Sequence, residues 1–121
     1  MHNAVNDLDV VFKALADPFR RRLLMLLSDS QYFCQSSGRT VHGICVRDLS
    51  RHLDAPQSTV SRHLAILSGS GLVSHDRDRT WHYYSVNPAR LTETVDWLNR
   101  LMTADANQTP TRGAALGSPS P

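Results

Sequence analysis

The polar side chains around Val60, Leu64 and Leu67 carry the clearest chemical pattern in the sequence. These three apolar residues recur at helical spacing, so they predict a helix with one packed face and one outward polar face. Short hydroxyl groups let a helix lie deep in the major groove of DNA, where glutamine can pair with adenine and arginine with guanine. The outward residues expected to read bases are Gln57, Ser58, Ser61 and Arg62.

Four more residues extend this predicted DNA-binding surface. Thr59 and His63 are better placed for a phosphate contact or for an internal hydrogen bond. Arg77 and Arg79 lie in a charged turn, from which they would reach the DNA backbone or the adjacent minor groove. A competing interpretation is that serine and threonine at the start of a helix only cap it.

Four helices are expected to bring these residues into place. Asp17 followed by Pro18 is typical of an N-cap and a first helical position, so one helix ends and another begins there. The run Arg20 to Arg22 is expected to lie largely outside. The third and fourth helices are separated by a three-residue turn, which is the helix-turn-helix pattern. The four helices are predicted over residues 5–17, 18–28, 47–53 and 57–68.

After the fourth helix the apolar residues alternate, which predicts a β-hairpin with a charged turn over residues 76–79. A last helix is expected over 89–102. Residues 103–121 have too few apolar groups to offset the entropy of ordering, so we expect a disordered tail. The predicted fold is mainly α with a small β-hairpin, a winged helix-turn-helix over residues 1–102.

Length and composition limit the classes of function. The chain has 121 residues and a mass of 13.5 kDa, enough for one compact domain. It has no apolar run long enough for a membrane span and no signal-peptide pattern, so we expect a cytoplasmic protein without a membrane partner. The sequence shows no nucleophile with an adjacent base, no glycine-rich phosphate loop and no paired carboxylates, so an enzyme is not expected.

The sequence resembles the ArsR/SmtB family of bacterial winged-helix repressors over roughly residues 5–102. The stretches that carry the likeness are FKALADPFRRRLLMLL, VRDLSRHLDAPQSTVSRHLAILSGSGLV and DRDRTWHYYSVNP. The resemblance implies a sequence-specific transcriptional repressor, a homodimer through the first and last helices, a palindromic double-stranded DNA operator and release by an inducer. The four outward residues of the fourth helix match the family's base-reading positions, and Pro56 replaces the serine that often precedes that helix.

The resemblance also raises a sensing site. The family motif that binds soft metals reads Cys-Val-Cys-Asp-Leu, whereas this chain has arginine in the third position, between Cys45 and Leu49. One thiolate is therefore retained and the second is replaced by Arg47. Cys34 and His42 would supply a second sulfur and an imidazole, a set that suits a soft transition metal or metalloid ion as inducer.

Three alternatives stay open at this point. Cys34 and Cys45 would serve a redox switch as a disulfide pair, with Arg47 favouring the reactive thiolate. Alternatively, Cys45 is a buried apolar residue and Cys34 an incidental loop thiol. The domain as a whole would also suit a protein-interaction module without DNA readout, in which replacing Arg62 would leave DNA affinity unchanged.

Overall fold

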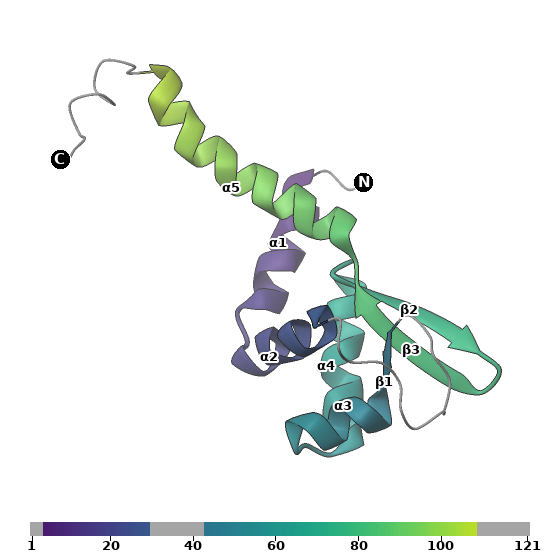
Figure 1. Ribbon diagram of the computed structural model, residues 1–121. Coiled ribbons are helices and arrows are strands. Elements are labelled where there is room, and N and C mark those ends of the chain that lie inside the picture. Colours follow the sequence, from purple (N-terminus) through teal and green to yellow (C-terminus); the bar gives the residue numbers. More distant parts are fainter. Residues whose placement is uncertain (1–3, 30–42, 109–121) are drawn as a thin grey trace. The chain divides into compact units, whose positions relative to one another are not determined.

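The computed structural model describes residues 4–29 and 43–108, which form five helices and three short strands. In chain order these are α1 (Ala4–Leu15), α2 (Pro18–Ser28), β1 (Ile44–Cys45), α3 (Val46–Leu53), α4 (Gln57–Gly69), β2 (Val73–Asp78), β3 (Trp81–Val86) and α5 (Pro88–Gln108). The chain divides into two compact units that meet between Arg90 and Leu91. The first unit contains the predicted helix-turn-helix and hairpin, and the second contains most of α5 (Figure 1).

The core of the first unit is built from the apolar faces that the spacing predicts. In α4, Val60, Leu64 and Leu67 each have 0% of their surface exposed. Leu49 of α3 and Leu23 of α2 are equally buried, because each lies on the apolar stripe of its helix. Leucine and valine side chains of three helices therefore fix the position of α4, and its polar residues are left on the opposite face.

A three-stranded antiparallel sheet in the order β1-β3-β2 lies beside these helices (Figure 1). The sequence predicted only the hairpin. It missed β1, because two residues are too few to show an alternating pattern. The predicted turn over residues 76–79 was also wrong, since β2 extends to Asp78. The chain reverses instead at Arg79, whose φ of 61° is a left-handed turn conformation.

The junction between α1 and α2 confirms the predicted cap. The carboxylate of Asp17 accepts hydrogen bonds from the backbone N–H groups of Phe19 and Arg20, at 2.7 and 3.1 Å. Pro18 occupies the first helical turn, where a missing N–H costs nothing. The N–H groups at the start of α2 are thus satisfied by one side chain.

Asp17 makes the stability of the domain depend on pH. The hydrogen bond from the N–H of Arg20, assisted by that of Phe19 and by the charge of the Arg20 guanidinium, holds the pKa of Asp17 below its ordinary value. Because the folded pKa is the lower one, the contribution is complete above about pH 4 and is lost as the pH falls through the folded pKa. In Asp17→Asn, which keeps a capping oxygen but loses the charge, we expect a urea midpoint that falls less steeply between pH 5 and 2 than in wild type. Parallel midpoint curves would contradict this.

The helix α5 is longer than the sequence predicted. It continues past the expected end at Met102 to Gln108, and the hydroxyl of Thr103 donates to the carbonyl of Asn99 at 3.0 Å. Residues 103–108 were predicted to be disordered because they bury little apolar surface. An existing helix nevertheless extends with one hydrogen bond for each added residue. The rest of the predicted tail, 109–121, lies outside the described residues.

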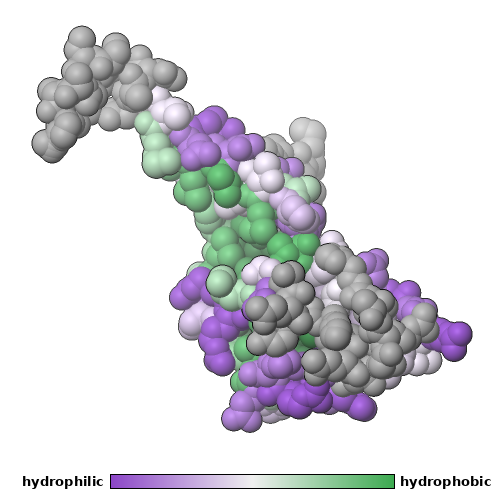
Figure 2. Space-filling model, viewed as in Figure 1, coloured by the Kyte–Doolittle hydropathy of each residue, from purple (hydrophilic) through white to green (hydrophobic). Residues whose placement is uncertain are grey.

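Apolar side chains are exposed along α5. Figure 2 shows this hydrophobic surface on the helix. The residues are Val95, Leu98, Leu101 and Met102, with 44–67% of their surface exposed.

No helix in the described part of the chain is long and apolar enough to cross a membrane.

Candidate nucleic-acid interface

The helix α4 presents an exposed polar face opposite its buried stripe. The four residues expected to read bases, Gln57, Ser58, Ser61 and Arg62, are all exposed. Their exposure follows from the complete burial of Val60 and Leu64 on the same helix, because a helix that packs one face must turn the other outward. The structure therefore brings these four side chains together on one surface.

The two remaining candidates on α4 lie closer to the core. Thr59 and His63 are half-buried. Nδ1 of His63 is 3.3 Å from Nη1 of Arg20, and its ring lies against Phe19 with centroids 4.8 Å apart. Of the two roles considered for His63, the structure places it in internal contact with α2.

Arg20 is not on the solvated face expected for it. Its side chain is only 14% exposed, and Nε and Nη2 donate to the carbonyls of Ala14 and Lys13 at 2.7 and 3.2 Å. A cation suits the carbonyl end of a helix. Arg20 thus joins the end of α1 to His63 on α4, while Arg21 and Arg22 stay exposed as predicted.

The turn before α4 sets the angle at which this helix leaves α3. Asp54 ends α3 in the left-handed conformation, with φ of 53°. The hydroxyl of Ser50 donates to the carbonyl of Ala55. Pro56 occupies the cap position of α4 and provides no side-chain hydrogen bond, as expected where proline replaces serine. The backbone at the start of α4 is therefore capped less completely than that of α2.

The hairpin β2–β3, called the wing below, carries the two predicted arginines. Both Arg77 and Arg79 are exposed. Nε of Arg77 donates to the carbonyl of Arg79 at 3.0 Å, which draws the guanidinium toward the turn. The structure thus places these two cations together at the wing tip.

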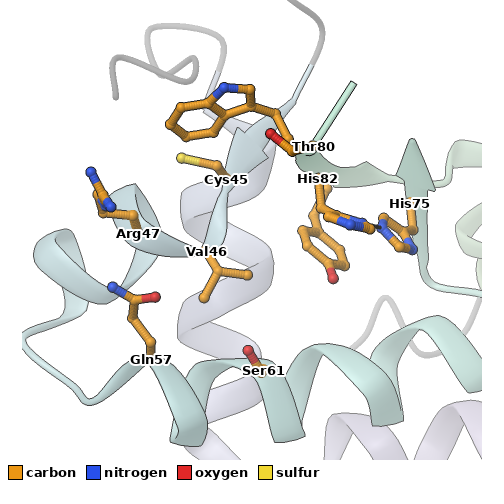
Figure 3. Close-up of a pocket in the computed structure, with 10 residues that line it drawn as sticks. Cys45, Val46, Arg47, Gln57, Ser61, His75, Thr80 and His82 are labelled. Carbon is orange, nitrogen blue, oxygen red and sulfur yellow. Dashed lines mark hydrogen bonds between the residues drawn. The ribbon is translucent and has the colours of Figure 1, made fainter. Parts of the chain in front are cut away.

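An open pocket of about 420 Å³ lies between α3, α4 and the wing (Figure 3). We call it the wing pocket. Its lining residues are Cys45, Val46, Arg47, Gln57, Ser61, His75, Thr80, Trp81, His82 and Tyr84. Two of the predicted base-reading residues, Gln57 and Ser61, therefore face the same space as side chains of the wing.

The wing pocket contains a histidine pair that the sequence analysis missed. Nε2 of His75 lies 2.5 Å from Nδ1 of His82, and the rings stack with centroids 4.7 Å apart. The ring of Tyr84 also stacks on that of His75, with centroids 4.7 Å apart. The signal in the sequence was the alternation of side chains along the hairpin. Residues two apart share a face, so His75 on β2 and His82 on β3 lie on the same side of the wing.

Comparison with known proteins identifies the family. The family model for bacterial regulatory proteins of the arsR family matches residues 44–75, from β1 through α4 to the start of the wing. Arsenic resistance transcriptional regulator ArsR1 of Pseudomonas putida is 33% identical over 101 residues, which are 82% of this chain and 67% of that protein. This chain belongs to the ArsR family.

Other relatives agree with this assignment. Transcriptional repressor SdpR of Bacillus subtilis is 30% identical over 88 residues, 73% of this chain and 84% of that protein. The homodimeric winged helix-turn-helix DNA-binding domain Mb0332 of Mycobacterium bovis has the same fold, with a TM-score of 0.57 and 24% identity over 87% of this chain and 84% of that domain. This ArsR-family protein is a DNA-binding transcriptional regulator and not an enzyme.

The sensing residues expected of an ArsR-family protein are only partly described. Cys45 precedes α3, is 3% exposed and packs against Tyr83 and Trp81. Cys34 and His42 lie outside the described residues. Within residues 4–29 and 43–108, no three histidine, cysteine or acidic side chains gather as a metal site would require. The structure therefore places one of the three predicted ligands, in a buried position.

Proposed function

We propose that this ArsR-family protein binds a specific DNA operator and reads its bases in the major groove with Gln57, Ser58, Ser61 and Arg62. The observation that carries the proposal is the exposed polar face of α4, held outward by a fully buried stripe. Arg62 would pair with guanine and Gln57 with adenine. Thr59, Arg77 and Arg79 would contact phosphates around this centre, while His63 stays in its contact with α2.

We infer that the working form is a homodimer joined through α1 and α5. Support comes from the apolar side chains that both helices expose, including Val10 on α1 at 44% and Leu101 on α5 at 59%. The similar domain from M. bovis is a homodimer. A dyad relates the two copies of α4, so the operator would be a palindrome with half-sites about 34 Å apart.

We also propose that the protein is a cytoplasmic repressor, which an inducer releases from its operator. Relatives include a transcriptional repressor and a regulator of arsenic resistance. A soft metal or metalloid bound by Cys45, with Cys34 and His42, would act close to the turn that sets the angle of α4.

The rival proposal is a thiol switch formed by Cys34 and Cys45. The burial of Cys45 beside Trp81 and Tyr83 favours a third interpretation, in which Cys45 is a purely structural residue.

Titration of the full chain against its own upstream DNA tests the proposed function. We expect affinity at least about 1,000-fold higher than for a random duplex of equal length, because specific binding of this class gains about 4 kcal/mol or more over non-specific binding. Sedimentation of the complex is expected to show two chains on one operator. Equal affinity for both duplexes, or one chain per operator, would overturn the proposal.

The same titration with arsenite, Zn²⁺ or peroxide tests the sensing residues. If the sulfurs bind the inducer, Cys34→Ser and Cys45→Ser both abolish the release that wild type shows, while their affinity without inducer stays within about twofold. Wild-type release by peroxide alone supports the disulfide. Release that survives in both variants would place the inducer elsewhere on the protein.

A further inference from the structure

The wing pocket is lined by groups that donate hydrogen bonds. Arg47 contributes a permanent positive charge, Gln57 an amide, and Ser61 and Thr80 hydroxyls. None of the described residues that line it is an aspartate or glutamate, although the chain has 11 acidic residues. Charged and neutral donors without a carboxylate suit an anion better than a cation.

The histidine pair adds two ring nitrogens whose orientation is fixed. Both imidazoles are exposed, and their mutual contact uses Nε2 of His75 and Nδ1 of His82. Within the described part of the chain, Nδ1 of His75 and Nε2 of His82 are thus left for a ligand. The Tyr84 ring lies nearly parallel to that of His75, with an interplanar angle of 6°. This stack restricts the rotation of the first imidazole.

The position of the wing pocket points to the DNA backbone as the source of the anion. Gln57 and Ser61 line the pocket and also belong to the face of α4 proposed to read bases. Figure 3 shows both of them on α4, across the pocket from His75 and His82 on the wing. A DNA strand whose base edges meet α4 carries its phosphates at the rim of that contact. The wing side of the pocket then faces a phosphate, while Gln57 and Ser61 on its α4 side face the bases.

We propose that the wing pocket binds a backbone phosphate of DNA, held by His75 and His82. The inference rests on the proposed function and adds a contact that reads no base. Imidazole is the side chain that ordinarily changes charge between about pH 5 and 8. One nitrogen of the contact between His75 and His82 must accept, so the neutral pair turns one N–H toward a ligand, and a pair that has gained one proton turns two. The phosphate contact therefore strengthens as the pH falls from 8 to 6.

The other charged and titratable groups near His75 and His82 do not change the expected direction of this pH dependence. On the wing, Arg77 stands opposite His82 in the strand register, whereas Asp76 alternates onto the other face. Burial raises the pKa of Tyr84, so its phenol stays neutral in this range. Arg47 on α3 keeps its charge, and the lining residues from α4 are uncharged. The buried thiol of Cys45 completes the β1 side of the pocket.

A random-sequence duplex tests the phosphate contact without an operator. The full-length double variant His75→Gln, His82→Gln is expected to bind this duplex about tenfold more weakly than wild type at pH 6, and within about twofold of wild type at pH 8. At pH 6 the slope of log affinity against log salt should be shallower by about one, as for one lost phosphate contact. The control His52→Gln removes an exposed histidine outside the pocket and is expected to follow wild type.

Wild-type NMR keeps the test independent of how the variant folds. The imidazole resonances of His75 and His82 should shift on adding the duplex, and should shift with inorganic phosphate only at far higher concentration. Equal sensitivity to inorganic phosphate would assign the pocket to free phosphate and overturn the DNA contact. Stoichiometric binding of Zn²⁺ at the pair without a change in DNA affinity would make it a metal site. Parallel pH curves for the double variant and wild type would also refute the proposal. None of these results would alter base reading by α4, which the operator titration tests separately.

Discussion

Arg62→Ala is expected to weaken binding to the operator by about 1–3 kcal/mol, or roughly 5- to 150-fold in affinity. Arg62 is exposed on α4 next to the buried Val60 and Leu64, so truncating it removes a base contact without opening the core. Affinity for a random duplex should fall much less, because non-specific binding rests on phosphates. Fluorescence anisotropy with both duplexes measures the two changes in one experiment.

Arg100→Ala is the matched control for this prediction. Arg100 is exposed on α5, outside α4 and the wing, and its replacement removes the same charge. We expect operator affinity within about twofold of wild type. If Arg62→Ala and Arg100→Ala lose the same factor on both duplexes, Arg62 acts only through net charge and the base contact is refuted.

Leu64→Ala is expected to have the largest effect on stability. Leu64 is completely buried in the centre of α4, so the substitution leaves a cavity that should lower the free energy of unfolding by about 2–5 kcal/mol. Ile66→Ala, two residues further along the same helix, provides the comparison because Ile66 is 42% exposed. Its cost should stay below about 1 kcal/mol. Urea denaturation of both variants measures the two changes in the free energy of unfolding. Equal losses would contradict the claim that the buried stripe fixes the position of α4.

The sequence was sufficient to predict features whose cause is local. Leu49 and Leu53 at helical spacing, followed by Pro56, predicted the helix-turn-helix with ends within one residue of those observed. Asp17 before Pro18 predicted a cap that the structure confirms. In each case the physical cause lies within a few residues of its effect, either as one helical face or as one hydrogen bond to the next turn.

The features that escaped prediction depend on contacts between distant residues. Arg20 was predicted to be solvated, because no residue near it in the sequence indicates a partner. In the structure its Nη1 lies 3.3 Å from Nδ1 of His63, 43 residues away. The pair His75 and His82 required the strand register before the two rings could be placed together. Strand β1 forms through pairing with β3, in which Ile44 lies opposite Tyr84 and Cys45 opposite Tyr83.

Selection of bound duplexes from a randomised pool tests most directly whether two copies of α4 read bases. For wild type we predict an inverted repeat with half-site centres about 10 base pairs apart, the spacing that a symmetric pair of reading helices requires. The pool selected by Arg62→Ala should lose its preference at one position of each half-site and keep it elsewhere. A wild-type pool without an enriched repeat, or one that is identical for the variant, would contradict the account.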